Sequence, residues 1–432
     1  MSKRGVSLLC FIAIAISLEL PLILSYIWMT GDFSVHRFNV WPITEWLINY
    51  QAGFIRRGLP GEILLRFFGH GSLLRALYFG MFLSFALYIA LFLWVYWKSG
   101  IRNGRVLLVA ILIQGGIFHM GLSADFYTRK ENVFLIFFAI QCLLYMQIQS
   151  TTQAREKYWI ALYALLLIVV SPVLVLIHEA YLFLSFPISA LLLWVLMLER
   201  PRFRYLRFVF IALCVEVPLT FLVCSHFHGD VLMSQVIWDS LPFAERLLIS
   251  PAAPYSAFGA IGSLGWDLGQ HLTTLYGVMS SGGIFVWVFF GAGNLFVLAY
   301  IFSSLQSRGV GGEQTQYFRW ILIALLLLLP MFLIASDWGR WIASISNQII
   351  LLMFAFWKSG LSRKPEVNSL CLLFGRRATL SASSIAFGLC ILYEISFKMP
   401  ECCAYYTDIY MPIAVYWDLA LKFLMQFPLF SL

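Results

Sequence analysis

Charged side chains are scarce in this sequence. Lys, Arg, Asp and Glu make up 12% of the 432 residues, against about 25% in an ordinary soluble domain. Hydrophobic residues account for 61% and aromatic residues for 17%. A surface facing water could not accommodate so much apolar side chain, so a soluble globular protein is excluded. The chain is therefore expected to be an integral membrane protein.

Other features are also missing from the sequence. No acidic, Pro-rich or Gly/Ser-rich tract indicates disorder, and no internal repeat of fixed period indicates a solenoid. The eight Cys show no metal-ligand spacing. The apolar stretches lack the alternation of a transmembrane β-barrel. The expected fold is therefore all-α and polytopic.

A spanning helix needs about 20 apolar residues, because about 30 Å of hydrocarbon is crossed at 1.5 Å per residue. The first qualifying stretch is expected to be a retained helix, since it is long, lacks a convincing cleavage site and carries Glu19. The fifth and sixth form one apolar run that Ser171-Pro172 and His178-Glu179 interrupt, which predicts two helices meeting at a tight apex. The eleven predicted spans are 7–29, 76–97, 106–122, 132–149, 158–177, 180–198, 208–225, 281–303, 320–336, 341–357 and 378–393.

The distribution of basic residues predicts the orientation. With a cytoplasmic N-terminus, the inner segments hold 18 of the 29 Lys and Arg, as the positive-inside rule requires. Fifteen of the 21 Asp and Glu, and all seven His, then lie outside or at outer helix ends. The net charge of +8 is mostly topogenic, so a nucleic acid partner is not expected. These counts predict a multi-pass membrane protein with its ionisable chemistry on the outer face.

The outer segments are too short to require a separate folded domain, so residues 1–432 are expected to form a single membrane domain. Two large outer loops are expected at 30–75 and 226–280. The segment 394–432 is an outer tail or contains a twelfth span. In the first outer loop, Trp41–Leu59 is expected to be a short helix lying in the membrane interface.

Ionisable residues from five segments are expected to meet on the outer side. Such a mixture suits transfer from a phosphate leaving group, because a carboxylate can deprotonate an attacking hydroxyl and cations can stabilise the departing phosphate. Arginine is suited to phosphate because it is always charged and forked. The candidate catalytic residues are Asp32, Glu62, Asp125 and Glu131. The candidates for binding substrate or phosphate are Arg56, Arg57, Arg129, His178, Glu179, Asp337 and Arg340.

Each group also has a simpler interpretation. Asp32 could be a loop acid or a helix N-cap, and the Arg56-Arg57 pair could contact lipid headgroups. The charged residues of the second outer loop, 119–132, could pair among themselves. Asp337 and Arg340 could pair with each other, being three residues apart. Acidic pairs could hold Mg²⁺ or Mn²⁺, but no spacing requires a metal.

The arrangement of residues 1–150 resembles the GT-C superfamily of polytopic glycosyltransferases. The resemblance lies in the cytoplasmic N-terminus, the acid Asp32 directly after the first span, the interfacial first outer loop and the charged second outer loop before the fourth span. It implies a sugar donor on a polyprenyl phosphate, a saccharide acceptor, Asp32 as the base and Asp125 with Glu131 as a second acidic site. The stretch Gly53-Phe-Ile-Arg56-Arg57-Gly58 also looks like segments in membrane proteins of bacterial surface-polysaccharide clusters. A large soluble C-terminal domain, which many members have, is missing here.

Three functions compete on this sequence. The leading hypothesis is a glycosyltransferase or polymerase in envelope polysaccharide synthesis, making exopolysaccharide, O-antigen or capsule from undecaprenyl-linked sugars. The second is a transporter or flippase of lipid-linked saccharides, which predicts ionisable groups near the bilayer midplane and broken helices. Only Glu19 and Glu216, each two residues before a proline, are central acids in the predicted spans. The third is a non-catalytic partner in an envelope assembly complex.

Overall fold

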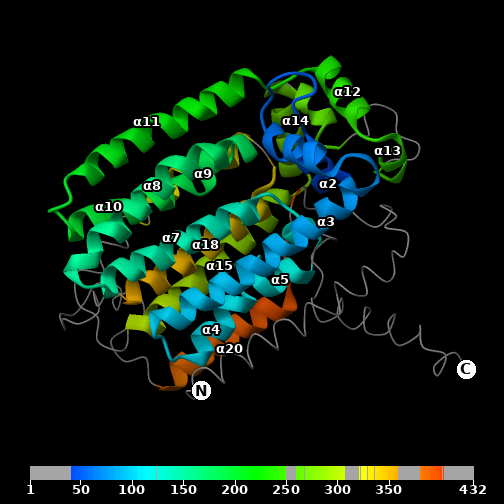
Figure 1. Ribbon diagram of the computed structural model, residues 1–432. Coiled ribbons are helices and arrows are strands. Elements are labelled where there is room, and N and C mark those ends of the chain that lie inside the picture. The colour runs from blue at the N-terminus through cyan, green and yellow to red at the C-terminus, as the bar shows by residue number, and fades with distance from the viewer. Residues whose placement is uncertain are drawn as a thin grey trace, which may run out of the picture.

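The computed structural model describes residues 40–122, 124–249, 259–266, 268–306, 321, 323–327, 329–334, 336–358, 380–400 and 402. The regular elements assigned in these residues are all helices, as predicted (Figure 1). Seven of the helical stretches are long and apolar enough to cross a membrane, by length and composition. The predicted first span 7–29, the residue Asp32 and most of the tail 394–432 lie outside the described residues.

The seven long stretches coincide with predicted spans. They are Ser72–Ser99 within α3 (Gly58–Ser99), Gly104–Gly121, which contains α4 and α5, and then α7 (Glu131–Ser150), α8 (Gln153–Ile177), α11 (Tyr205–His226), α15 (Gly283–Gln306) and α18 (Trp338–Lys358). Shorter apolar helices occupy three further predicted spans. They are α9 (Tyr181–Leu184) with α10 (Phe186–Glu199), α17 (Leu329–Ile334) and α20 (Leu380–Ser396). The expected apex after residue 177 is confirmed, because α8 ends at Ile177 and only three residues separate it from the start of α9 at Tyr181.

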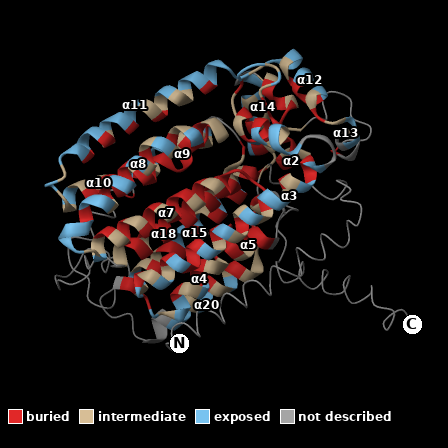
Figure 2. Ribbon diagram, viewed as in Figure 1, coloured by how far each residue is buried: buried red, intermediate tan, exposed pale blue. Residues whose placement is uncertain are grey.

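Helix α18 lies at the centre of the bundle, where it contacts α3, α7 and α15. Figure 2 shows α18 and α7 buried along most of their length, whereas α11 is exposed along its outer side. The exposed side chains of α11 are apolar and include Phe208, Val215 and Leu222. An apolar face with no protein neighbour is what a lipid-facing helix presents.

Helix α3 must bend strongly between its ends. A straight helix of 42 residues would be about 63 Å long, twice the length of α7. Yet Lys130, directly before α7, donates to the carbonyl of Arg57 at the start of α3, and Lys98 near its end reaches Gln147 near the end of α7. The span Ser72–Ser99 begins directly after the sequence Gly69-His70-Gly71, where glycines favour a bend. The first part of α3 therefore belongs to the end of the bundle at which α7 begins.

A small cap covers this end. It consists of α2 (Val40–Leu47), the loop to α3 with the start of that helix, α12 (Val231–Ser240), α13 (Phe243–Ile249), η3 (Gly262–Gly265) and α14 (Leu268–Ser280). Most of these segments share a second hydrophobic core, which includes Leu47, Ile55, Leu77 and Trp238. The cap is visible at the right-hand end of the bundle in Figure 1.

The cap corrects two sequence predictions. The interfacial helix predicted over Trp41–Leu59 ends at Leu47, because the chain turns at Gly53 (φ +100°), whose N–H donates to the carbonyl of Tyr50. The segments 58–75 and 226–280, predicted as loops, contain helices. The returning backbone passes so close to α3 that a Cβ atom on Gly61 would lie 2.1 Å from the carbonyl oxygen of Ile48.

The predicted span 106–122 is interrupted. Four residues separate helix α4 (Gly104–Leu112) from α5 (Ile117–Leu122), and the short α6 (Ala124–Tyr127) follows. Gly115 adopts φ +71° and lies against Ala343 of α18. Side chains of the bundle bond the carbonyls freed by the break, since Asn294 donates to Gln114 and Asn347 donates to Gly115. Irregular backbone at membrane depth is tolerated where protein buries it in this way.

Candidate functional site

Glu45 of α2 is the centre of a buried group of ionisable side chains. Glu45 is 1% exposed, and its carboxylate faces four basic side chains from four other segments. The nearest atoms are Nε2 of His178 at 3.1 Å, Nη1 of Arg129 at 3.3 Å, Nη1 of Arg57 at 3.8 Å and Nη1 of Arg340 at 4.0 Å. Burial raises the pKa of Glu45, but the hydrogen bond from His178 and the charges of Arg129 and Arg340 outweigh it and hold the pKa well below its ordinary value. The carboxylate is therefore ionised.

Arg57 and Glu179 form the tightest pair of the group. The Nε of Arg57 lies 2.9 and 2.8 Å from the two carboxylate oxygens of Glu179, and its Nη2 lies 2.6 Å from Oε1. Arg57 also has φ +64°, the only positive φ of a non-glycine residue in the described part of the chain. That conformation costs roughly 1 to 2 kcal/mol, so the surrounding contacts must impose it.

Arg56 lies at the edge of the group, with its side chain 16% exposed. Its Nη1 is 3.5 Å from Oε1 of Glu179, and its backbone N–H donates to the carbonyl of Phe227 at 2.9 Å. The Nε atom of Arg56 is buried and has no hydrogen-bond partner in the described structure. Phe54 packs against Tyr50 and Phe227 beside it. Arg56 thus connects the buried charges to an aromatic rim.

Lys130 is fully buried and is not paired with a carboxylate in the described structure. Its Nζ donates to the backbone carbonyls of Arg57 at 3.1 Å and Ile177 at 3.2 Å, and faces the ring of Trp46 at 5.7 Å. Burial lowers the pKa of Lys130 to about 7, although the charge of Glu45 opposes the shift. Lys130 therefore releases its proton more readily than an exposed lysine does.

Arg340 of α18 joins the remaining acids to the group. It pairs with Asp337, as one of the simpler interpretations predicted, and its Nη1 lies 3.1 Å from Oε1 of Glu131. Neither oxygen of Glu131 accepts a hydrogen bond within the described residues. A cavity of about 20 Å³ lies beside these side chains, lined also by Arg129 and Ser344. That volume suffices for about one water molecule.

These residues are called the charged cluster below. It contains the cations Arg56, Arg57, Arg129, Lys130 and Arg340, the carboxylates Glu45, Glu131, Glu179 and Asp337, and His178. In His178, Nδ1 accepts the N–H of Ala180 at 3.1 Å. Its Nε2 lies 3.1 Å from Oε1 of Glu45. Five cations against four carboxylates leave a formal excess of one positive charge when Lys130 is protonated.

The structure brings eight of the eleven predicted site residues together. They are Arg56, Arg57, Arg129, Glu131, His178, Glu179, Asp337 and Arg340. Helices α7 and α18 begin at the cluster and α8 ends there, so these residues share one end of the bundle. Within the second outer loop, Arg129 pairs with Glu45 of α2 and Glu131 pairs with Arg340 of α18, so each has a partner in another segment.

The other predicted residues are placed differently. Glu62 accepts hydrogen bonds from Nε of Arg66 at 2.7 Å, the N–H of Tyr50 at 3.1 Å and Nε2 of Gln51 at 3.2 Å. Its carboxylate thus fixes the loop between α2 and α3. Asp125 belongs to α6, but its side chain, like the whole of Asp32, lies outside the described part of the structure.

Two members of the cluster were not predicted as site residues. Glu45 lies within the apolar stretch Trp41-Pro-Ile-Thr-Glu45-Trp46-Leu-Ile, and an acid in such surroundings needs partners. Lys130 follows Arg129 at the mouth of a span, and both break the positive-inside pattern. An acid within an apolar stretch and a basic residue on the predicted outer side are the sequence signals that could have identified Glu45 and Lys130.

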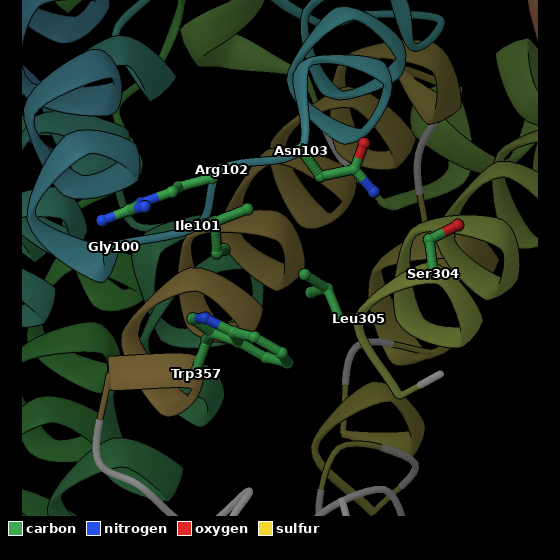
Figure 3. Close-up of a pocket in the computed structure, with 7 residues that line it drawn as sticks. All are labelled: Gly100, Ile101, Arg102, Asn103, Ser304, Leu305 and Trp357. Carbon is green, nitrogen blue, oxygen red and sulfur yellow. The ribbon is translucent and has the colours of Figure 1, made fainter. Parts of the chain in front are cut away.

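A larger cavity of about 260 Å³ lies near the opposite end of α3 and is lined by Gly100, Ile101, Arg102, Asn103, Ser304, Leu305 and Trp357 (Figure 3). Its one charged lining residue, Arg102, extends away from Asn103 and Ser304 in Figure 3. The Asn103 side chain accepts the N–H of Arg105 and so caps α4. The lining of this cavity includes Arg102 but no Asp or Glu, so the charged cluster is the better candidate site. No group of three or more His, Cys, Asp or Glu in the described residues could hold a metal ion.

Comparison with known proteins places the chain in a family of membrane proteins. The model of the family described as "Uncharacterised membrane protein Rv1490" matches residues 11–245, and the chain belongs to this family. The matched region includes all of the cluster except Asp337 and Arg340. Membership agrees with the several apolar helices of the structure in indicating a multi-pass membrane protein.

The curated relatives are mycobacterial. The chain is 23% identical over 350 residues to uncharacterised proteins of Mycobacterium tuberculosis and Mycobacterium bovis. The similarity covers 74% of this chain and 77% of each relative. No solved structure matches the chain.

Proposed function

We propose that this member of the Rv1490 membrane-protein family is a glycosyltransferase or polysaccharide polymerase that takes sugars from a polyprenyl phosphate. In the proposed topology the chain has eleven or twelve spans and a cytoplasmic N-terminus in a bacterial inner membrane. The charged cluster then faces the periplasm, where lipid-linked saccharides of envelope polysaccharides are assembled. The acceptor is a second saccharide.

One observation carries the proposal, namely that Lys130, when protonated, gives the described residues of the cluster one buried cation more than carboxylates. A cluster serving stability alone gains nothing from an unmatched buried cation, because burying an unpaired charge is costly. An anionic ligand would compensate that charge. A phosphate on a prenyl tail brings negative charge to the level where the apolar helices end.

Arg56 and Lys130 are the residues best placed for this phosphate. Arg56 is at the exposed rim and pairs with Glu179 at only 3.5 Å, so its guanidinium retains donors for a phosphate oxygen. Lys130 lies behind Arg57, whose carbonyl it contacts. A phosphate beside Arg56 would favour the protonated form of Lys130 and so recruit its charge. The cluster must open for the sugar itself to enter, since its cavity holds about one water.

Glu131 is the described carboxylate best suited to act as the base. Glu62 is saturated by three hydrogen bonds, whereas neither oxygen of Glu131 accepts one. In the proposed step Glu131 accepts the proton of an acceptor hydroxyl, and that oxygen bonds to the anomeric carbon of the donor. The bond between this carbon and the phosphate oxygen breaks, and the phosphate leaves on its lipid. Asp32 and Asp125 remain candidate acidic residues for the same reaction.

The decisive experiment is an analysis of lipid-linked saccharides in a deletion strain. Loss of a transferase would leave truncated or undecorated saccharides, and loss of a polymerase would leave single repeat units. Complementation with Arg56→Ala should fail to restore the product, whereas Arg66→Ala should restore it. Arg66 is the matched control, because it lies ten residues away on the same segment, is largely exposed and pairs only with Glu62 outside the cluster. Unchanged saccharides in the deletion strain would refute the proposal.

Transport of a lipid-linked saccharide is a second candidate function. The interruption between α4 and α5 favours it, because broken helices commonly mark the sites of transporters. The same deletion strain separates the two functions. Accumulation of a complete lipid-linked intermediate on the inner leaflet would indicate transport.

A further inference from the structure

The carboxyl group of Glu394 is isolated in the interior of the bundle. Glu394 lies near the end of α20, a helix that contributes no residue to the charged cluster. It is 0% exposed, and neither carboxyl oxygen has a hydrogen-bond partner in the described structure. It takes part in none of the ion pairs formed between described residues. Such a group inside a membrane protein is a candidate functional site.

The backbone around Glu394 is held against the break between α4 and α5. The Nε2 of Gln114 donates to the carbonyls of Glu394 at 3.0 Å and Phe397 at 2.7 Å. The Oε1 of Gln114 accepts the N–H of Met399 at 2.9 Å. One amide in the break therefore fixes the end of α20, so that the position of the Glu394 side chain depends on how α20 packs there.

Among the described residues, no titratable neighbour donates a hydrogen bond to the Glu394 carboxyl group. From α5, the ring of His119 lies beside the backbone carbonyl of Glu394, and neither of its nitrogens makes a hydrogen bond of good geometry. On α20 itself, the side chains that would feel the charge of an ionised Glu394 are Cys390 and Tyr393, and neither is a cation. The Tyr393 hydroxyl already donates to the carbonyl of Phe290 on α15. Lys398 follows α20, and the break between α4 and α5 presents the neutral Gln114.

We propose that Glu394 is a proton-binding site inside the bundle and that the packed arrangement of α20 against the broken helix is its protonated state. A carboxylate without donors is far costlier to bury than a neutral carboxylic acid. Release of the proton therefore requires water to reach the side chain, which requires α20 to separate from the break. Glu394 thus couples protonation to the packing of α20, independently of the reaction at the charged cluster.

Infrared spectroscopy of the purified full-length protein in lipid nanodiscs reads the protonation state directly. At pH 7 the wild type should show the carbonyl band of a protonated carboxylic acid, and Glu394→Gln should lose it. Glu62→Gln is the control and should retain the band, because Glu62 is an ionised acid bonded to Arg66. A spectrum at pH 7 that is the same with and without Glu394 in a folded protein would overturn the proposal.

A second measurement uses the wild type alone and so does not depend on the folding of a variant. Dicyclohexylcarbodiimide reacts with protonated carboxyl groups in apolar surroundings, and peptide mass spectrometry locates the product. Modification of Glu394 should occur at pH 7 and should be equal in sodium chloride and choline chloride. Protection by sodium but not by choline would overturn the proton assignment in favour of a sodium site. Failure of the transferase proposal would change neither measurement.

Discussion

Neutralising Glu45 should cost more stability than neutralising an exposed acid. Glu45→Gln keeps the shape of the side chain but removes the charge that faces His178, Arg129, Arg57 and Arg340. Breaking a buried ion pair from one side costs about 3 to 5 kcal/mol. The amide retains one acceptor oxygen, so we expect a loss near the lower limit, about 3 kcal/mol. Its NH₂ group would also meet the donors of the surrounding arginines.

Denaturant unfolding in mixed lipid–detergent micelles measures this loss. The matched control is Asp239→Asn, which removes a carboxylate that pairs with Arg246 in the cap and is 55% exposed. The control should change the free energy of unfolding by less than about 1 kcal/mol. If Glu45→Gln were as stable as the control, Glu45 could not be the electrostatic centre of the cluster.

The same variant should alter the response to acid. Because the pKa of Glu45 is held below its ordinary value of 4.5, its stabilising contribution is complete above that value and is lost as the pH falls below it. The wild type should therefore lose stability steeply below about pH 4, where Glu45→Gln should lose less. Equal acid sensitivity of the two proteins would show that the low pKa is not coupled to folding.

Three further predictions test other parts of the structure. The free energy of unfolding of the wild type should rise between pH 7 and 10.5, because over this range Lys130 holds a proton in the unfolded chain but, with its pKa of about 7, has released it in the folded state. Lys130→Met should remove this rise. If the unfolding free energies of the two proteins changed in parallel across this range, the prediction would be wrong. Arg57→Lys should destabilise by about 1 to 3 kcal/mol, since lysine keeps the charge but not the forked contact with Glu179. Gly115→Ala should prevent folding or cost more than about 3 kcal/mol, because a Cβ atom there would lie 2.3 Å from that of Ala343 at φ +71°. Its control, Gly80→Ala, meets no atom within 4 Å and should be neutral or stabilising by up to about 1 kcal/mol, as thermal unfolding of both variants would show.

The spans could be predicted because hydrocarbon thickness and helical rise together fix their length. Composition could not predict the break after Leu112, where Gly115 abuts α18 and two asparagines from other helices bond the freed carbonyls. The helical part of 58–71 was also missed, since Arg66, His70 and two glycines interrupt its apolar pattern. In both places long-range contacts decide the local structure.

The gathering of charges at one end was predictable, but the identity of the pairs was not. Topology alone brings the starts of α7 and α18 to the end of α8. Whether Arg129 pairs with its neighbour Glu131 or with Glu45, which is 84 positions away, depends on how α2 is placed by the cap. The sequence contains no local signal for that placement, so Glu45 was recognised only as one outer acid among many.

The cluster is difficult to explain as a device for stability. Buried ion pairs can often be replaced by well-packed apolar side chains without loss, and this chain has apolar residues in abundance. It instead keeps ten ionisable side chains at one end of the bundle, holds Arg57 at a positive φ and buries Lys130 without a carboxylate. Each of these features costs stability, and the described residues of the cluster hold one cation more than carboxylates whenever Lys130 is protonated. An arrangement with that cost and that excess is what a site for an anionic ligand requires.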